Sequence, residues 1–365
     1  MFVEITNEPR DYAWGSTTAI AELQGREPSG RPEAELWLGT HPGSPARLVG
    51  RDGTLRDVAG ELPFLVKILA AATPLSLQAH PTTEQAQQGF ARENAAGIPL
   101  DSPNRNYRDP YAKPEMLYAL SDEFRALCGF RPVADTRADL STGGVGHLLP
   151  ELRSDADIRP VFEWLLSGDP GVSDVVAEVS AASAGASGDS WRTVRGLVAH
   201  FPGDPGIAVS LLLHTVVLQR GEALYLPAGN IHAYQEGLGI ELMGPSDNVL
   251  RGGLTSKHVD VAELLSVLDF RALPVPRLEA TTDGRVTVFA PEGAGLQLKV
   301  LEDGAEVTAA APSIALVLEG SVTLGSGRDA SEPQVGRVSA PSAVAIVGVH
   351  ETLRCTGRVI LASSQ

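Results

Sequence analysis

The chain has 365 residues, of which 43% are hydrophobic, so it can bury a sizeable core and form two or three folded units. Acidic residues (45) outnumber basic ones (29), and the net charge of −16 argues against a nucleic-acid partner, because an anionic surface repels a phosphate backbone. No apolar run approaches the length of a membrane span, and MFVEITNEPR lacks the basic and apolar regions of a secretory leader. We therefore expect a cytoplasmic protein with no membrane partner.

Glycine (38) and proline (26) are numerous and aromatic residues make up 5%, a composition that favours many turns and short strands. Residues 1–130 carry short apolar stretches, such as ELWLG, PFLVKILAA and EMLYAL, with one helix expected over 82–93. In residues 131–204 the apolar residues recur at spacings of three and four, which predicts a small helical insert.

Strand-like patterns return in residues 205–270 and continue to the end of the chain. The tail, residues 271–365, is a series of short apolar runs separated by turn formers, which is typical of a sandwich or jelly roll. Within it, IALVLEGSVTLG is close to a hairpin signature with its turn at Glu319–Gly320. The fold class predicted is therefore mainly β with a small helical insert.

Three short segments contain candidate metal ligands. Gln78 and His80, in SLQAHP, lie two positions apart and leave the same face of an extended strand, either as a pair of ligands or as an ordinary polar patch. His232 lies at a turn-bounded strand edge in PAGNIHAY, and Glu115 in AKPEM is the candidate carboxylate. Two imidazoles, one carboxylate and one neutral oxygen suit a divalent ion such as zinc. His41, in LWLGTHP, is ambiguous.

A fourth segment, ELMGPSDNVLRGGLTSKHVD at 241–260, concentrates Glu241, Asp247, Arg251 and Lys257 among glycines and turn formers. This pattern is typical of a binding loop held by a scaffold, but the charge pattern alone favours a solvated loop. The two cysteines lie far apart without CxxC spacing, so neither a disulfide scaffold nor a thiolate zinc site is expected.

Taken together, six motifs strongly resemble the type I phosphomannose isomerases, which are zinc enzymes of the cupin superfamily. They are YAWG (12–15), AELWLGTHP (34–42), SLQAHP (76–81), KPEM (113–116), GNIHAY (229–234) and SDNVLRGGLTSK (246–257). They occur in family order, whereas the tail resembles the family mainly in pattern. The resemblance implies a cupin-like catalytic domain from 1–130 plus 205–270, a helical insert at 131–204 and a C-terminal jelly-roll-like domain at 271–365.

Position by position, the resemblance implies one Zn²⁺ per chain, with the ligands Gln78, His80, Glu115 and His232. Arg251 matches the arginine to which the family assigns catalysis. The other matching positions fall where the family lines its pocket, and they are Trp14, Glu35, Ser76, Lys113, Tyr234, Glu241, Asp247 and Lys257.

The activity implied is the interconversion of mannose 6-phosphate and fructose 6-phosphate through an enediol, within the carbohydrate metabolism that leads to GDP-mannose. A divalent metal stabilises the negative charge that develops on oxygen. Arg251 offers a cationic fork for the phosphate or for that oxyanion, and we favour the reacting end. The general base stays open between Glu241, Lys113 and Asp247, and Tyr234 is grouped with these catalytic candidates.

The chain departs from the common family pattern at two places. Many relatives have a histidine where this chain has Ala112, and many have a lysine shortly after QxHP, where it has Thr82 and Thr83. Because the implied ligand set is intact, we expect that the histidine is dispensable and that phosphate contacts have shifted toward Arg105 or Arg108.

The expected partner is a small-molecule sugar phosphate, and the expected assembly is a monomer or weak oligomer. Two functions from other classes stay open. An iron-dependent cupin oxygenase also uses two histidines and a carboxylate, but it has no need for a loop resembling SDNVLRGG. A catalytically silent sugar-phosphate sensor would keep the site without turnover.

Overall fold

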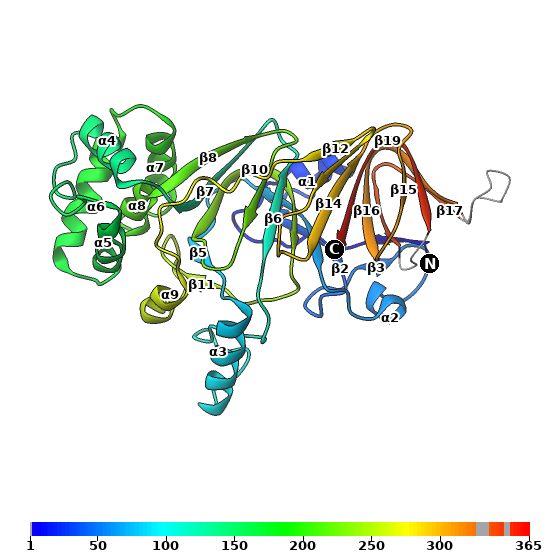
Figure 1. Ribbon diagram of the computed structural model, residues 1–365, viewed down its shortest axis with the longest axis horizontal. Helices are drawn as coiled ribbons and strands as arrows, with labels where there is room; N and C mark the ends of the chain where they lie inside the picture. The colour runs from blue at the N-terminus through cyan, green and yellow to red at the C-terminus, as the bar shows by residue number, and fades with distance from the viewer. Residues whose placement is uncertain (1, 326–335, 347–350) are drawn as a thin grey trace.

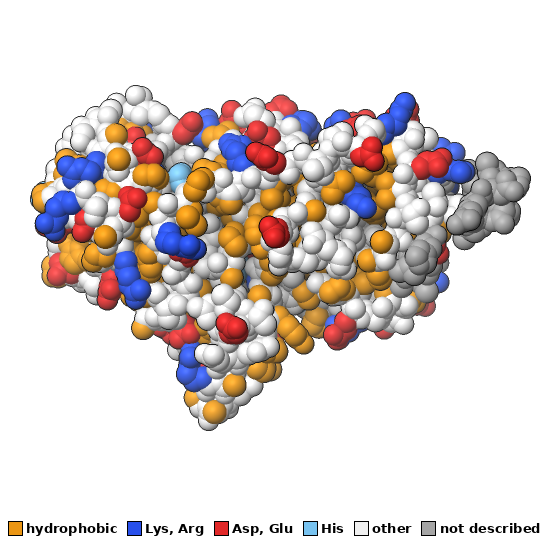
Figure 2. Space-filling view, in the orientation of Figure 1, with side chains coloured by type: hydrophobic (Ala, Val, Ile, Leu, Met, Phe, Trp, Pro, Cys, Tyr) orange, Lys and Arg blue, Asp and Glu red, His pale blue; other side chains and the backbone are white. Residues whose placement is uncertain are grey.

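The computed structural model describes residues 2–325, 336–346 and 351–365, and it is mainly β, as the sequence predicts. Its described strands form two antiparallel sheets that lie side by side along the longest axis, and most of its helices gather at one end (Figure 1). On the face seen in Figure 2, acidic and basic side chains are interspersed. Among the described helices, none combines the length and apolarity needed to cross a membrane.

The first sheet contains nine strands in the described part of the chain. They are β2 Glu35–Gly39, β4 Leu65–Ala71, β5 Gln78–Ala79, β6 Glu115–Ala119, β7 Glu123–Phe130, β8 Leu213–Gln219, β9 Ala223–Leu226, β10 His232–Met243 and β11 Leu250–Arg251. The first part of β10 pairs with β5 and β7, and the second with β4 and β6. Gly237, with φ +132°, lies at this change of partners, where an added Cβ would lie 2.7 Å from the Phe124 ring.

The second sheet contains ten described strands. They are β1 Phe2–Thr6, β3 Arg47–Leu48, β12 Thr281–Asp283, β13 Val286–Phe289, β14 Leu296–Leu301, β15 Glu306–Thr308, β16 Ser313–Gly325, β17 Gly336–Ser339, β18 Ser342–Ile346 and β19 Thr352–Ser364. Strand β1, from the start of the chain, pairs with β18 on one side and with β3 on the other. This sheet therefore joins the first strand to the last third of the sequence.

The hairpin predicted at Glu319–Gly320 is wrong. Strand β16 continues through these residues and pairs with β19 on both sides of a register shift between Val317 and Glu319. Gly320 has φ +73°, and a Cβ there would lie 2.1 Å from the Thr356 carbonyl oxygen. Gly320 therefore lies beside a β-bulge between two long strands. A bulge needs the same conformational freedom that a turn needs, and glycine provides it in both.

The other strands predicted in the tail are observed as β13, β14 and β19. Strand β18 covers the first part of AVAIVG, and Val347 and Gly348 lie outside the described residues.

The longer helices also agree with the predicted pattern. The described helices are α1 Ala19–Leu23, α2 Leu55–Ala59, α3 Thr83–Ala95, α4 Val133–Gly143, α5 Ile158–Leu165, α6 Pro170–Ser183, α7 Asp189–His200, α8 Gly206–Val209 and α9 Val261–Val267, with 3₁₀ turns at Asp155–Asp157 and Ser210–Leu212. Helix α3 begins with a capping box of Thr82 and Gln85, and it projects from the body of the molecule (Figure 1). Helices α4 to α8 form the cluster at the end of the first sheet (Figure 1).

The strands β2, β4 and β10 have two different faces, because successive side chains alternate across a strand. Their apolar face, with Leu36, Ile68 and Ile240, packs in one core with Leu298 and Leu316 of the second sheet. Side chains at the intervening positions point to the opposite face, where charged residues gather. The second sheet thus supports the strands that carry the site.

Candidate active site

Two histidines and a glutamate converge on the polar face of the first sheet. His80 follows β5, Glu115 begins β6 and His232 begins β10, and each is at most 1% exposed. Glu115 Oε1 lies 3.3 Å from His80 Nε2, and Glu115 Oε2 lies 3.2 Å from His232 Nε2. The three side chains offer ligand atoms that all lie within 4.8 Å of one another, so they can hold one metal ion.

Backbone carbonyls fix both imidazoles in the same tautomer. His80 Nδ1 donates to the Asn248 carbonyl at 2.7 Å, and His232 Nδ1 donates to the Asn230 carbonyl at 3.1 Å. Each ring therefore presents an unprotonated Nε2 to the cluster, the arrangement that metal-binding histidines use. Within the described residues, His80 Nε2 and Glu115 Oε2 make no hydrogen bond, whereas Glu115 Oε1 is ion-paired with Lys113 Nζ at 2.8 Å. The two buried atoms without a hydrogen bond fit a divalent cation.

Gln78 adds an amide to this cluster. Its Cα is the register partner of His232, and its Nε2 lies 3.3 Å from His232 Nε2. A half-turn of the amide exchanges its nitrogen and oxygen and brings the oxygen toward the same imidazole. Gln78 is thus placed to supply the neutral oxygen of a four-ligand set.

The charges around the cluster favour the protonation states that a metal requires. Burial opposes ionisation of Glu115, but the ammonium of Lys113, whose Nζ lies 2.8 Å from Oε1, together with His80, holds the pKa of this carboxyl well below its usual range. Burial lowers the pKa of His80 to about 4. Near neutral pH the site therefore presents a carboxylate and a neutral imidazole.

Lys67, in the middle of β4, is a site residue that the sequence analysis missed. Its Cα is the register partner of both Trp37 and Glu241, and its Nζ lies 2.9 Å from Glu241 Oε2 and 3.8 Å from Glu35 Oε1. Trp37 Nε1 donates to Glu35 Oε2 at 2.7 Å, which orients that carboxylate. Burial disfavours the charged lysine, but the carboxylates of Glu241 and Glu35 raise its pKa overall. The sequence signal that could have identified this residue is a lysine inside the apolar run PFLVKILAA.

Three cations lie close together beside the cluster. Burial lowers the pKa of Arg251, and Arg108 lowers it further. Burial also lowers the pKa of Lys257, followed by the charges of Arg251 and Arg108. Across residues 2–325, 336–346 and 351–365, no carboxylate forms an ion pair with any of the three. In a chain of net charge −16, such an uncompensated group is a candidate anion site.

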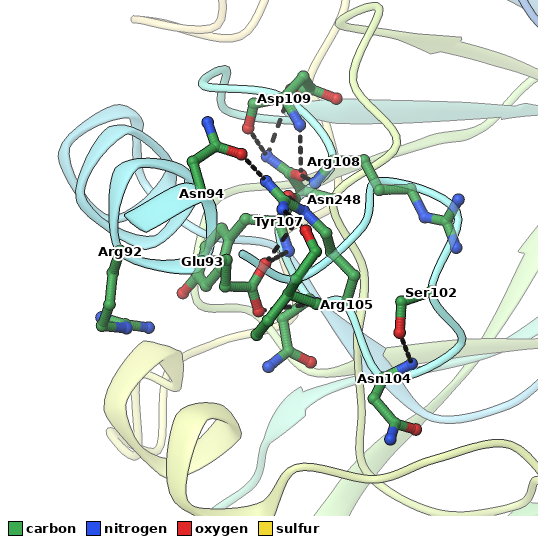
Figure 3. A network of polar contacts seen from close by, with 12 residues as sticks. Arg92, Glu93, Asn94, Ser102, Asn104, Arg105, Tyr107, Arg108, Asp109 and Asn248 are labelled. Carbon is green, nitrogen blue, oxygen red and sulfur yellow. Dashed lines mark hydrogen bonds and ion pairs between the residues drawn. The ribbon is translucent and has the colours of Figure 1, made fainter. Parts of the chain in front are cut away.

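Arg105, unlike the three cations, is bound by protein groups. It is 5% exposed, and it donates to the Tyr107 carbonyl at 2.7 Å, to Asn94 Oδ1 at 2.6 Å and to the Ile98 carbonyl, with Glu93 Oε2 3.4 Å from its Nε (Figure 3). These contacts hold the loop that carries Arg108. Of the two arginines predicted to take over phosphate contacts, only Arg108 lies among the cations.

The remaining predicted residues surround this centre. Asp247 is 49% exposed, and its Oδ2 lies 3.5 Å from Nε2 of the buried His41. Burial, followed by the carboxylates of Glu241 and Glu115, raises the pKa of Tyr234 well above its usual range. Trp14 packs against the interior cluster that contains Tyr234, and Ser76 lies just before β5.

The comparisons with known proteins agree with this geometry. Residues 2–133 match the model of the type I phosphomannose isomerase catalytic domain. The mannose-6-phosphate isomerase of Escherichia coli is 40% identical over 303 residues, which are 75% of this chain and 76% of that protein. The chain belongs to the type I phosphomannose isomerase family. Another member, from Salmonella typhimurium, is 39% identical over 302 residues, which are 75% of this chain and 76% of that protein.

A solved structure extends the family relationship to the whole fold. The crystal structure of a zinc-bound mannose 6-phosphate isomerase matches with a TM-score of 0.89 and 31% identity, over 100% of this chain and 99% of that one. The sequence-based assignment to the family and the predicted mainly β, cupin-type fold are thereby confirmed.

Proposed function

We propose that the protein is a zinc-dependent aldose–ketose isomerase that interconverts mannose 6-phosphate and fructose 6-phosphate through an enediol. One observation carries the proposal: two buried ligand atoms without hydrogen-bond partners, His80 Nε2 and Glu115 Oε2, lie beside a group of uncompensated cations. These cations are Arg108, Arg251 and Lys257. A metal and a phosphorylated substrate are the two ligands that such neighbouring sites fit.

The metal would be held by Gln78, His80, Glu115 and His232. When bound, zinc supplies Lewis-acid stabilisation of negative charge on a substrate oxygen and brings no redox chemistry. The backbone carbonyls on the two Nδ1 atoms keep both imidazoles oriented toward the centre. Lys113 stays paired with Glu115, which keeps this carboxylate ionised inside the protein.

We assign the three cations to different ends of the substrate. Arg251 is the register partner of Gln78, which places it next to the metal centre, and we assign it to the oxyanion of the reacting end. Arg108 and Lys257 are both exposed, and we assign them to the phosphate. Trp14, Glu35 and Ser76 are proposed to line the substrate site.

For the general base we propose Asp247. Glu241 is committed to a buried ion pair with Lys67, and Lys113 is committed to Glu115, whereas Asp247 keeps 49% of its side chain exposed. Asp247 would remove the proton from C2 of the open-chain aldose, which forms the C1–C2 double bond and places the negative charge on O1. After the hydroxyl proton of O2 moves to O1, the protonated Asp247 would return its proton to C1, and the C2–O2 carbonyl of the ketose forms. Lys67, Glu35 and Glu241 would form a fixed charged wall around the sugar, and Tyr234 would add a neutral phenol.

Several wider features belong to the same proposal. We place the protein in the cytoplasm as a monomer or weak oligomer that binds a small sugar phosphate and neither nucleic acid nor membrane. We also propose the division into a catalytic domain (1–130 plus 205–270), an insert (131–204) and a C-terminal domain (271–365).

A coupled assay of mannose 6-phosphate conversion, with and without a chelator, tests the function. We expect turnover by the untreated protein, loss after chelation and recovery on addition of zinc. Unphosphorylated mannose should be a far poorer substrate, because the three cations would have no anion to bind. Oxygen consumption without isomerisation would instead support an iron-dependent oxygenase, and tight sugar-phosphate binding without turnover would support a sensor.

A further inference from the structure

Asn248 lies at the junction between the metal cluster and the loop that carries Arg108. Its side chain is fully buried and makes hydrogen bonds with both of its ends (Figure 3). Oδ1 accepts from the backbone nitrogens of Arg108 at 2.7 Å and Asp109 at 3.3 Å. Nδ2 donates to the Asp109 carbonyl at 2.8 Å and to the Tyr111 carbonyl at 2.9 Å.

The main chain of Asn248 contacts the metal cluster, on the other side from the Arg108 loop. Its carbonyl accepts the hydrogen bond from His80 Nδ1 at 2.7 Å, which leaves His80 Nε2 directed at the metal cluster. Its backbone nitrogen donates to Ser246 Oγ at 3.2 Å, and Ser246 Oγ donates in turn to the Tyr111 carbonyl at 3.2 Å. One residue therefore touches a proposed metal ligand through its backbone and the cationic loop through its side chain.

This double role requires a carboxamide of this length. Only an amide combines an acceptor for two N–H groups with a donor for two carbonyls. An aspartate would keep the acceptor but place a carboxylate against the carbonyls of Asp109 and Tyr111, where the amide now donates. An alanine would remove these partners from four backbone groups, the N–H groups of Arg108 and Asp109 and the carbonyls of Asp109 and Tyr111.

The loop is anchored on both sides of Arg108. On the N-terminal side, Arg105 ties it to Asn94 of α3, and Glu93 accepts from the backbone nitrogens of Asn106 at 3.0 Å and Tyr107 at 2.9 Å. On the C-terminal side, the Asn248 side chain is the clamp, with the Asp109 carboxylate accepting from the Asp247 backbone nitrogen at 2.8 Å. Between these anchored segments, the Asn248 side chain is the group that holds the backbone nitrogen of Arg108 itself.

We propose that Asn248 is a positioning residue, which holds Arg108 in register with Arg251 and Lys257 and thereby sets the distance between the phosphate and the metal ends of the substrate. The inference rests on the proposed function, because it assumes that these cations bind the substrate phosphate. Asn248 itself contacts neither the substrate nor the metal. Its effect should appear in substrate affinity and phosphate preference, with little effect on metal content.

The test is Asn248→Ala, with Asn7→Ala as the matched control. Asn7 also donates from its side chain to two carbonyls, those of Trp37 at 2.9 Å and Ser44 at 3.1 Å, and none of its hydrogen bonds in the described residues involves the loop of Arg108. We expect N248A to raise the KM for mannose 6-phosphate and the inhibition constant of inorganic phosphate by roughly 10-fold each, with kcat changed less than about threefold. Zinc content should stay at the wild-type level, because His80 is held by a main-chain carbonyl.

A double variant separates positioning from a general loss of stability. If Asn248 acts through Arg108, N248A combined with R108A should bind no more weakly than R108A alone. Additive losses, an unchanged KM in N248A, or a loss of zinc with an unchanged KM would each overturn the inference. If N248A does not fold, the isosteric N248D should show the same rise in KM, and an unchanged KM in N248D would equally overturn it.

Phosphate binding can test the positioning role even if the proposed function is wrong. If the wild-type protein does not isomerise mannose 6-phosphate, the same comparison is made with equilibrium binding of inorganic phosphate. Weaker binding by N248A, again non-additive with R108A, would support the positioning role without the reaction. Equal binding by wild type and N248A would overturn that role.

Discussion

Gln78 and Arg251 are register partners on the adjacent strands β5 and β11, and His232 is the partner of Gln78 on its other side. Residues from three distant segments thus form one row across the sheet. This row places the proposed metal centre next to the most buried of the three cations. It would let the proposed metal and Arg251 act together on the reacting end of one small molecule.

The metal centre predicts a specific effect of Glu115→Gln. The variant removes the only carboxylate among the proposed ligands, so zinc affinity should fall by more than about 100-fold, since even outer partners of metal ligands contribute 10–100-fold. Metal analysis after dialysis at limiting zinc measures the loss. Glu222→Gln, which breaks the exposed ion pair with Arg277, should keep zinc. Full zinc occupancy in E115Q would remove Glu115 from the ligand set.

Different roles for Arg251 and Lys257 predict different kinetic effects. Arg251→Lys keeps the charge but loses the planar fork, and it should lower kcat by about 100-fold with a small change in KM. Lys257→Ala should mainly raise the KM for the phosphorylated sugar. Steady-state kinetics with mannose 6-phosphate separate the two effects. Equal losses of kcat in both variants would contradict the division between reacting end and phosphate.

The buried ion pair of Lys67 predicts an effect on stability. Lys67→Met leaves Glu241 and Glu35 as buried carboxylates without their ammonium partner, so the free energy of unfolding should fall by about 3 kcal/mol. A second substitution, Glu241→Leu, should recover part of that loss. Urea unfolding measures both variants, with Lys299→Met at a partly exposed position of β14 as the control. A K67M protein as stable as the wild type would show that the pair contributes nothing.

The buried thiol of Cys128 predicts a dependence of stability on pH. Burial raises the pKa of Cys128 to about 12, whereas an unfolded cysteine titrates near ~8.5. Above about pH 9 the unfolded chain has lost this proton and the folded chain has kept it, so the contribution of the thiol to stability falls by about 1.4 kcal/mol per pH unit. Below about pH 8 that contribution is fully present. Urea unfolding between about pH 8 and pH 11 should show a shallower decline for Cys128→Ala than for the wild type, and parallel curves would contradict the shift.

Much of the fold was predictable because it rests on local patterns. Short apolar runs between turn formers identified β13, β14 and β19, and spacings of three and four identified α5, α6 and α7. The turn predicted at Glu319–Gly320 failed because a bulge and a hairpin use the same glycine, and only the pairing partner tells them apart. The domain boundaries at residues 130, 204 and 270 stay a prediction.

The candidate site was predictable where a residue lies in a motif, and not where it acts through tertiary contacts. The structure brings His80, Glu115 and His232 together from three separate motifs. Lys67 was missed because its neighbours on β4 are apolar, and its partners on β2 and β10 become visible only in the sheet. The link between Asn248 and Arg108 is a contact between two loops, which no sequence spacing encodes.

The pairing of β1 with β18 has a consequence for how the chain is made. Residues 2–6 leave the ribosome long before their partner on one side, residues 343–346, which follows more than 330 positions later. Strand β1 therefore lacks β18 until residues 343–346 have been synthesised. A sequence separation of this size slows formation of the sheet. A fragment that stops before residue 340 would leave this strand with β3 alone and an exposed edge able to associate with other chains.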